Sequence, residues 1–315
     1  MFYFSFFLLA LPLAAQVTHI VTSLKVRILS TMLADDEGFG EWGFAALVEA
    51  DGRRILFDTG AHPDTVLRNL AALKIDITDV NEVILSHHHL DHTAGLVSLR
   101  EAFAKRNPKA LSTAHVGQGS FAIRPNKDGT EGNPMAAIRI AYERAGGHFV
   151  EHASPIELYP GIWLSGPVPR KYPERNWGPS RRILSTGGEL IEDNLPEDQS
   201  LVINTAQGLV VVAGCSHAGI VNILDYARSK VRQAPIHAAI GGFHLFNAKE
   251  EALAWTADKF KAFGLQNLLG AHCTGIESVF RLRQLTGLDR RTAAVVALGG
   301  GFTLGAGLDP GNIAR

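Results

Sequence analysis

A run of histidines directly after a short apolar segment restricts what this chain can fold into more than any other feature. Residues 86–92 read Ser-His-His-His-Leu-Asp-His, and they follow a strand that the apolar pattern predicts for Glu82–Leu85. In an extended segment, residues two apart project to the same side, so His87 and His89 can reach one metal ion. The run therefore predicts a metal site at the end of a strand.

The second half of the run lies at the turn into a helix that the spacing of apolar residues predicts for Thr93–Ala104. Asp91 and His92 can supply a second set of ligands from this turn. Imidazole nitrogens and carboxylate oxygens are the ligands that zinc and similar ions prefer in hydrolytic sites. His88 is expected to point away from its neighbours and is not counted as a ligand.

Three further histidines follow predicted strands in the same way. The strands are Leu209–Ala213, His237–Ile240 and Asn267–Ala271, and the histidines are His217, His244 and His272. Ligands of α/β sheets bind at the carboxyl ends of strands, and glycines before these histidines allow close approach. We therefore predict that His217 and His272 belong to the site. For His244, substrate contact or proton transfer is favoured over metal ligation.

Strands and helices alternate along the rest of the chain in two comparable halves, which predicts an α/β sandwich with sheets inside and helices outside. The other predicted strands are Leu24–Ser30, Gly43–Glu49, Arg54–Asp58, Leu111–His115, Ile162–Ser165, Leu201–Thr205 (in a hairpin with Leu209–Ala213) and Ala294–Leu298. The other predicted helices are Pro63–Leu73, Met135–Ala145, Ile220–Arg228, Lys249–Phe263 and Ile276–Leu285. We expect a single domain over residues 17–315, with a loop-rich insertion around residues 150–200.

The first residues are expected to lie outside that domain. Residues 1–15 carry no charged side chain and form an apolar run shorter than the ~20 residues of a membrane-spanning helix. The run ends in Leu13-Ala14-Ala15 before Gln16, which is compatible with signal-peptide cleavage. We predict a signal peptide over residues 1–16, export to the periplasm or the medium, and no stable membrane association after cleavage. An uncleaved anchor formed by residues 1–15 is the alternative.

Composition narrows the class of partner. Hydrophobic residues make up 46% of the chain and charged residues 19%, which excludes a disordered chain. Thirty basic and thirty-one acidic residues give a net charge of -1, and no basic stripe is evident, so a nucleic-acid partner is not expected. The two cysteines, Cys215 and Cys273, are too few for a disulfide scaffold. A small-molecule substrate is the expected partner.

The motifs resemble those of a known family. The pattern His87-x-His89-x-Asp91-His92, with Asp58-Thr59-Gly60 about thirty residues upstream, resembles the metallo-β-lactamase superfamily. Four further segments resemble the subfamily labelled 7,8-dihydropterin-6-yl-methyl-4-(β-D-ribofuranosyl)aminobenzene-5′-phosphate synthase, and these are residues 165–170, 214–220, 241–245 and 272–275. The resemblance runs from about residue 24 to residue 302. It implies an αββα sandwich with a one- or two-metal site between the sheets.

The resemblance also implies a ligand set. The implied metal ligands are His87, His89, Asp91, His92 and His272, with His217 as a further candidate. The ion is expected to be zinc, with iron or manganese as alternatives. Where the superfamily usually places a bridging aspartate, this chain has Cys215, so either Cys215 or His217 completes the site, or a second ion binds weakly. For Asp198, ligation and a turn-capping role are both open.

These residues predict an enzyme that uses metal-activated water on a small anionic or heterocyclic substrate, at an ester, lactone or phosphoester bond. Asp91 is expected to orient or deprotonate the water, and His244 to protonate the leaving group or contact the substrate. Arg170 is the candidate for binding an anionic group of the substrate, whereas Lys171 is expected to be a surface charge. The alternatives are a synthase-like transferase, as the subfamily label implies, and a non-catalytic sensor that binds a metal or a ligand.

Overall fold

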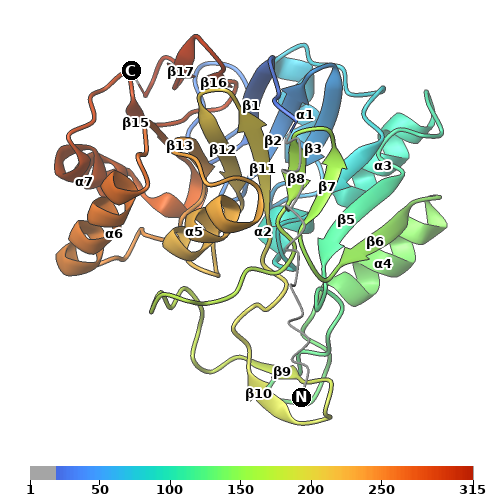
Figure 1. Cartoon of the computed structure of the whole chain (residues 1–315). Helices are drawn as coiled ribbons and strands as arrows, with labels where there is room; N and C mark the ends of the chain where they lie inside the picture. The colour runs from blue at the N-terminus through green and yellow to red at the C-terminus, as the bar shows by residue number, and fades with distance from the viewer. Residues whose placement is uncertain (1–18, 315) are drawn as a thin grey trace, which may run out of the picture.

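The computed structural model describes residues 19–314, which form two β-sheets with helices on their outer faces (Figure 1). The first sheet has the order β17 (Gly307–Asp309), β16 (Gly301–Thr303), β1 (Leu24–Ser30), β2 (Ala45–Ala50), β3 (Arg53–Phe57), β4 (Glu82–Ile84), β5 (Thr113–Gly117) and β6 (His148–His152). The second has the order β15 (Ala293–Val295), β14 (Asn267–Gly270), β13 (Ile236–Gly241), β12 (Gly208–Ala213), β11 (Ser200–Thr205), β8 (Ile162–Leu164) and β7 (Ile156–Tyr159).

Each sheet is antiparallel in one half and parallel in the other. Strands β3 to β6 are parallel in the first sheet, and β12 to β15 are parallel in the second. The six residues of β12 and the six of β13 are all buried. Such continuously buried segments are typical of parallel strands that are covered on both faces.

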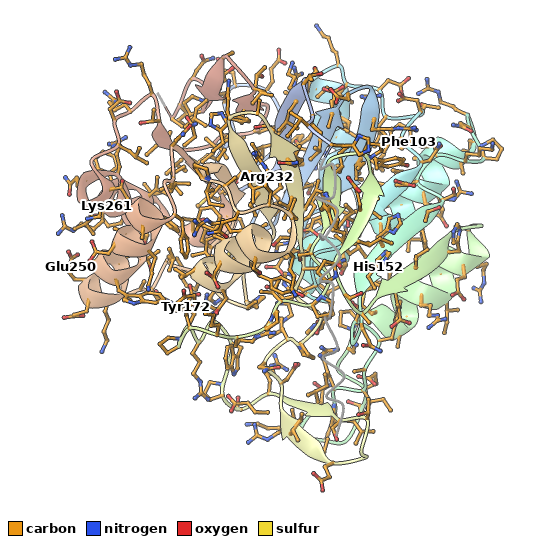
Figure 2. The ribbon with its side chains drawn as sticks, viewed as in Figure 1. Phe103, His152, Tyr172, Arg232, Glu250 and Lys261 are labelled. Atoms are coloured by element: carbon orange, nitrogen blue, oxygen red, sulfur yellow. The ribbon has the colours of Figure 1, made fainter. Side chains whose placement is uncertain are left out.

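The helices cover the two outer faces. They are α1 (Thr65–Ala72), α2 (Leu90–Thr93), α3 (Leu96–Ala104), α4 (Met135–Arg144), α5 (Ile220–Lys230), α6 (Glu250–Ala262) and α7 (Ile276–Thr286), with a short 3-10 turn at His272–Thr274. One apolar core lies between the sheets and includes Ile84 and Val212. A second joins the seven-stranded sheet to α5, α6 and α7, and a third joins the eight-stranded sheet to α1, α3 and α4, with Phe103 of α3 in it (Figure 2). The predicted αββα sandwich is confirmed.

Two differences from the predicted elements have identifiable causes. The helix predicted for Thr93–Ala104 is divided into α2 and α3 around Gly95. A Cβ atom on Gly95 would lie 2.2 Å from the carbonyl oxygen of Thr59, so this close approach, made by a residue distant in sequence, sets the break. Strands β16 and β17 were not predicted, because three-residue segments rich in glycine carry no strand periodicity.

The range around residues 150–200 contains both core strands and a projection. Strands β7 and β8 belong to the seven-stranded sheet, whereas β9 (Arg182–Leu184) and β10 (Leu190–Glu192) form a separate two-stranded sheet, seen at the bottom of Figure 1. Residues 175–195, which include this small sheet, are called the arm below. The backbone N–H of Leu184 donates to the carbonyl of Ile123, 2.9 Å away, which ties the arm to the loop after β5.

The predicted signal peptide falls on residues 1–16, which lie outside the described residues. Within residues 19–314, no helix is long and apolar enough to cross a membrane.

Candidate metal centre

The site is built at the carboxyl ends of the parallel strands in both sheets. In the eight-stranded sheet, Asp58 directly follows β3, and the run of residues 86–92 follows β4 after Leu85. In the seven-stranded sheet, the ends of β12, β13 and β14 lead to Cys215 and His217, to His244 and to His272. Because the sheets pack face to face, these strand ends meet at one edge of the sandwich.

A first group of ligand-type side chains consists of His87, His89 and His217, each of which offers one ring nitrogen within 4.8 Å of the others. The Nδ1 atom of His217 donates to the carbonyl oxygen of Asn176 in the arm. The Nδ1 atom of His87 lies 2.9 Å from the hydroxyl of Ser86. These contacts leave the buried Nε2 atoms of His87 and His217 without a hydrogen-bond partner among the described residues.

A second group consists of Asp91, His92, Cys215 and His272, again with ligand atoms within 4.8 Å of one another. The Nε2 atom of His92 lies 3.1 Å from the thiol sulfur of Cys215. An oxygen of Asp91 lies 3.3 Å from Nε2 of His272. The structure thus places His217 with the first group and Cys215 with the second, although sequence reasoning had treated these two residues as alternatives.

Asp198 belongs to neither group. Its carboxylate accepts a hydrogen bond of 2.8 Å from the backbone N–H of Ala218, directly after His217. Burial raises the pKa of Asp198 to about 7 despite this bond. Ligation and turn capping were both left open for Asp198, and the hydrogen bond to Ala218 corresponds to the turn-capping role.

The two groups fit metal ions on chemical grounds. Buried polar atoms are normally hydrogen-bonded, yet ring nitrogens of His87, His217 and His272 have no such bond among residues 19–314. Burial, together with the neighbouring imidazoles, lowers the pKa of His87 and of His89, and burial lowers that of His217 to about 3. The imidazoles of the first group are therefore neutral and offer lone pairs. In the second group burial opposes the charge of His272, but its contact with Asp91 raises its pKa to about 9. Imidazole, carboxylate and thiol groups together form a donor set suited to zinc or iron. Zinc itself stays a prediction.

The backbone is strained where these side chains leave the strands. Asp58, Ser216, His244 and His272 have φ values of 57°, 56°, 51° and 45°, in the left-handed region that non-glycine residues rarely adopt. Such strain persists only where surrounding contacts impose it, and it gathers at functional sites.

Asp58 is a site residue whose role sequence reasoning missed. The Asp58 carboxylate accepts hydrogen bonds from the backbone N–H (2.7 Å) and from the hydroxyl (2.8 Å) of Ser86. The same carboxylate lies 2.7 Å from Nδ1 of His92. A Cβ atom on Gly214 would lie 2.1 Å from the Ser86 hydroxyl oxygen, so glycine is needed there for the sheets to approach. The sequence feature that could have indicated this role is the Asp58-Thr59-Gly60 segment directly after β3.

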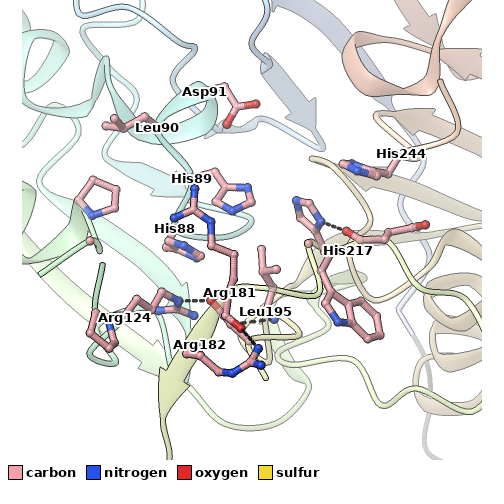
Figure 3. A pocket seen from close by; sticks show the side chains of 17 residues that line it. His88, His89, Leu90, Asp91, Arg124, Arg181, Arg182, Leu195, His217 and His244 are labelled. Atoms are coloured by element: carbon pink, nitrogen blue, oxygen red, sulfur yellow. Dashed lines mark hydrogen bonds and ion pairs between the residues drawn. The ribbon is translucent and has the colours of Figure 1, made fainter. Parts of the chain in front are cut away.

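The metal centre opens into a cavity of about 440 Å³, shown in Figure 3. His89, Asp91, His217 and His244 line it. A histidine ring nitrogen, Nδ1 of His244, is buried there without a hydrogen-bond partner among the described residues. The position of His244 is compatible with the predicted substrate contact or proton transfer.

Arg170, the predicted anion-binding residue, does not line this cavity. Its guanidinium donates to the backbone carbonyls of Val168 (2.9 Å) and Leu195 (2.6 Å), which fastens the base of the arm. Lys171 is exposed and forms an ion pair of 2.8 Å with Asp225, on the surface. The arginines that line the cavity are instead Arg124, Arg181 and Arg182.

His88 does not point away from its neighbours as predicted, because its ring centroid lies 4.5 Å from that of His89, but it takes part in a buried charge network and in neither ligand group. The Nδ1 atom of His88 lies 2.6 Å from Glu197, whose other carboxylate oxygen accepts a bond of 2.7 Å from Arg124. Arg124 also pairs with Asp193, 2.8 Å away. Burial opposes the ionisation of Glu197, but the hydrogen bond to His88 and the charge of Arg124 lower its pKa to about 2. This network holds the cavity wall to the arm.

Two further features border the second group. The thiol of Cys273 lies 3.2 Å from that of Cys215, and with His244 these two thiols form a third set of side chains whose ligand atoms lie within 4.8 Å of one another. On the outer side, the half-exposed ring of Trp42 packs against His272 and against Phe246, with ring-centroid distances of 4.9 and 5.4 Å. Sequence reasoning did not identify these aromatic residues, because nothing in the chain near Trp42 marks it as a neighbour of His272.

Comparison with known proteins decides the family. A family model described as the metallo-beta-lactamase superfamily matches residues 43–187. The 7,8-dihydropterin-6-methyl-4-(beta-D-ribofuranosyl)-aminobenzene-5'-phosphate synthase of Methanocaldococcus jannaschii is 32% identical over 267 residues, which cover 82% of this chain and 90% of that protein. The chain belongs to the metallo-β-lactamase superfamily.

Two solved structures of superfamily members are similar to this one. A metal-dependent hydrolase of the β-lactamase superfamily is 25% identical, with a TM-score of 0.70 over 90% of this chain and 99% of the other. The metallo-β-lactamase-fold protein YhfI of Bacillus subtilis is 12% identical, with a TM-score of 0.55 over the same shares, and supports the fold alone. The predicted family resemblance is confirmed, and membership of this superfamily supports an enzymatic role.

Proposed function

We propose that this protein is a metal-dependent hydrolase that acts on a small anionic or heterocyclic substrate at an ester, lactone or phosphoester bond. One observation carries the proposal. Two groups of ligand-type side chains, with buried ring nitrogens that lack hydrogen-bond partners among the described residues, lie at one cavity of about 440 Å³. A cavity of this size accommodates a small molecule.

The first group would hold one ion and the second group another. Ions held in this way would supply an activated water and a Lewis acid that stabilises developing negative charge. The Asp91 side chain is 24% exposed and lines the cavity, so its second oxygen can orient the attacking water. His244 lines the same cavity with Nδ1 unbonded, where it can pass a proton to the leaving group.

Metal content per chain tests the proposal. On protein lacking residues 1–16, we expect two equivalents of metal for the wild type by elemental analysis. The variants Cys215→Ser and His217→Ala should each retain about one equivalent, because each loses a ligand from a different group. His148→Ala, an exposed position in β6 outside the candidate ligand groups, is the control and should retain two. Absence of bound metal in the wild type would overturn the proposal.

A transferase is the second candidate, and two observations favour it. The relative from M. jannaschii is named as a synthase. A second cavity of about 470 Å³ lies beside the first and shares Asn176 and His244 with it, so two reactants could meet at His244.

Products distinguish the two candidates. The metal-loaded protein would be incubated in 18O-labelled water, with ester and lactone probes alone and with a dihydropterin plus a ribofuranosylaminobenzene phosphate. Label in a product acid or alcohol supports hydrolysis. A coupled product without label, whose mass is the sum of the two reactants minus that of the departing group, supports transfer and rejects hydrolysis as the main activity.

A further inference from the structure

We propose that Arg181 and Arg182 of the arm form an anion-binding subsite that selects substrates with a phosphate or carboxylate group apart from the reacting bond. The inference rests on the proposed function, since it takes the reacting bond to lie over the metal centre. It assigns to these two residues the role that sequence reasoning gave to Arg170.

Arg181 faces the cavity with its charge uncompensated. It lines the cavity together with His89 and Asp91. In Figure 3 its side chain extends toward His88 and His89. No ion pair or side-chain hydrogen bond of Arg181 occurs among residues 19–314, so its guanidinium is free to bind a ligand.

Arg182 adds a second positive charge at the same wall. Its guanidinium donates to the backbone carbonyls of Pro179 and Arg181, both at 2.9 Å, and within the described chain no carboxylate lies within ion-pair distance of it. Carbonyl acceptors leave the positive charge of a guanidinium in place, and its planar set of N–H donors matches the oxygens of a phosphate or carboxylate.

The third arginine of the cavity behaves differently. Arg124 is buried and contacts both Asp193 and Glu197, at 2.8 and 2.7 Å. Two carboxylates therefore already neutralise Arg124, whereas Arg181 has no ion pair among the described residues, and Arg182 has none within 4.0 Å although Glu192 stands opposite it on β10. Asp91, His89 and His217 line the same cavity, so the arginines of the arm and the ligand-type residues of the metal centre face one space.

The backbone that carries these arginines is anchored. The carbonyl of Arg181 accepts a bond of 3.1 Å from the N–H of Asp193, and the backbone of Arg182 lies opposite that of Glu192 in the antiparallel register of β9 and β10. The indole N–H of Trp177 donates to the carboxylate of Glu192 at 2.8 Å, which links the first residues of the arm to β10. The two guanidiniums are thus presented from a hydrogen-bonded element rather than from a free loop.

Three p-nitrophenyl esters with the same leaving group test the subsite on the metal-loaded protein. Their acyl parts are butyrate, succinate and 3-phosphonopropionate, which end in a methyl, a carboxylate and a phosphonate group. We expect the anionic esters to have a KM at least tenfold below that of the butyrate. The anionic ester with the lower KM shows whether the subsite prefers a carboxylate or a phosphonate.

Substitution assigns the preference to the arm. Arg181→Gln should raise KM for the anionic esters about tenfold, as loss of a charge-assisted contact does, and leave the butyrate unchanged. The double variant Arg181→Gln/Arg182→Gln should abolish the preference for anionic esters. Arg290→Gln, at an exposed position outside the cavity lining, is the control. An anionic preference that survives in the double variant would overturn the proposal.

Failure of the proposed function is recognised separately. If none of the esters is hydrolysed faster than by chelator-treated protein, hydrolysis is rejected. The subsite is then tested by calorimetric titration of the metal-loaded protein with inorganic pyrophosphate. Binding that weakens at least tenfold in the double variant supports the subsite, and equal binding by wild type and double variant rejects it.

Discussion

The Nδ1 atom of His92 lies 2.7 Å from Oδ2 of Asp58, and the opposite ring nitrogen of His92 lies 3.1 Å from the thiol of Cys215. The carboxylate therefore selects the ring orientation in which Nε2 faces the second ligand group. Carboxylates that hold the far nitrogen of a ligating histidine fix its tautomer and raise its basicity. Asp58 connects the end of β3 to the metal centre in this way.

Asp58→Asn should weaken metal binding about 10- to 100-fold, because the amide holds the imidazole less firmly in its ligating tautomer. Competition with a chromophoric chelator measures the affinity. Asp258→Asn, an exposed change on α6, is the control and should leave the affinity unchanged. Equal affinities for Asp58→Asn and the wild type would show that His92 needs no such support.

Gly214→Ala should disturb both stability and metal content. The added Cβ would lie 2.1 Å from the Ser86 hydroxyl oxygen and 2.7 Å from Oδ2 of Asp58, and such overpacking costs about 1–3 kcal/mol. Thermal unfolding and elemental analysis check the two effects. In Gly187→Ala, the control, the nearest neighbour of the new Cβ lies 3.7 Å away, and both quantities should match the wild type.

Removal of metal should destabilise the fold, because ions that bind the folded state alone stabilise it by mass action. At a free ion concentration of 100 times Kd the stabilisation is about 2.7 kcal/mol per site. We expect a chelator to lower the thermal midpoint of the wild type and to leave that of His87→Ala/His272→Ala nearly unchanged, since this variant lacks a ligand in each group. A thermal midpoint of the wild type that stays the same when the chelator is added would contradict the metal assignment.

Glu174 should make stability depend on pH. Burial raises its pKa to about 7, although its carboxylate accepts bonds from the N–H groups of Val221 and Asn222 at the start of α5. A raised pKa in the folded state means that stabilisation is complete below about pH 4.5 and is lost as the pH rises through about 7.

The comparison with Glu174→Gln isolates this effect. The difference in unfolding free energy, wild type minus variant, should fall by up to ~3 kcal/mol between pH 4.5 and 8. Urea unfolding at several pH values measures it, and other ionisable groups cancel because both proteins share them. A constant difference across this range would show that Glu174 titrates normally.

Much of the metal centre was predictable because its signals are local. The His-x-His-x-Asp-His spacing after β4 and the histidines after β12, β13 and β14 follow from the geometry of strand ends. The alternation of strands and helices predicted the layers, because each element must bury its apolar face. The hairpin of β11 and β12 was predicted from two apolar segments and a short polar turn, and the structure confirms it.

Contacts between distant segments were not predictable. Arg170 looked like an anion-binding residue because it is a cation in a polar stretch, yet its Nη1 and Nη2 atoms donate to backbone carbonyls such as that of Leu195, and it does not line the cavity. Arg181 lies only eleven residues further on and carries no sequence mark that distinguishes it from Arg170. The fold of the arm decides which of the two faces the cavity.

The sequence by itself determined the superfamily, the αββα layers and the residue types of the metal centre, because these depend on periodicity and on spacing along one segment. The tertiary structure alone decided how the residues are shared between two groups, with His217 in one and Cys215 in the other. It also decided that Asp58 orients His92 and that Arg181 and Arg182 of the arm line the cavity. These features depend on distances of a few ångströms between segments far apart in the chain, and only the packing of the two sheets and the arm sets those distances.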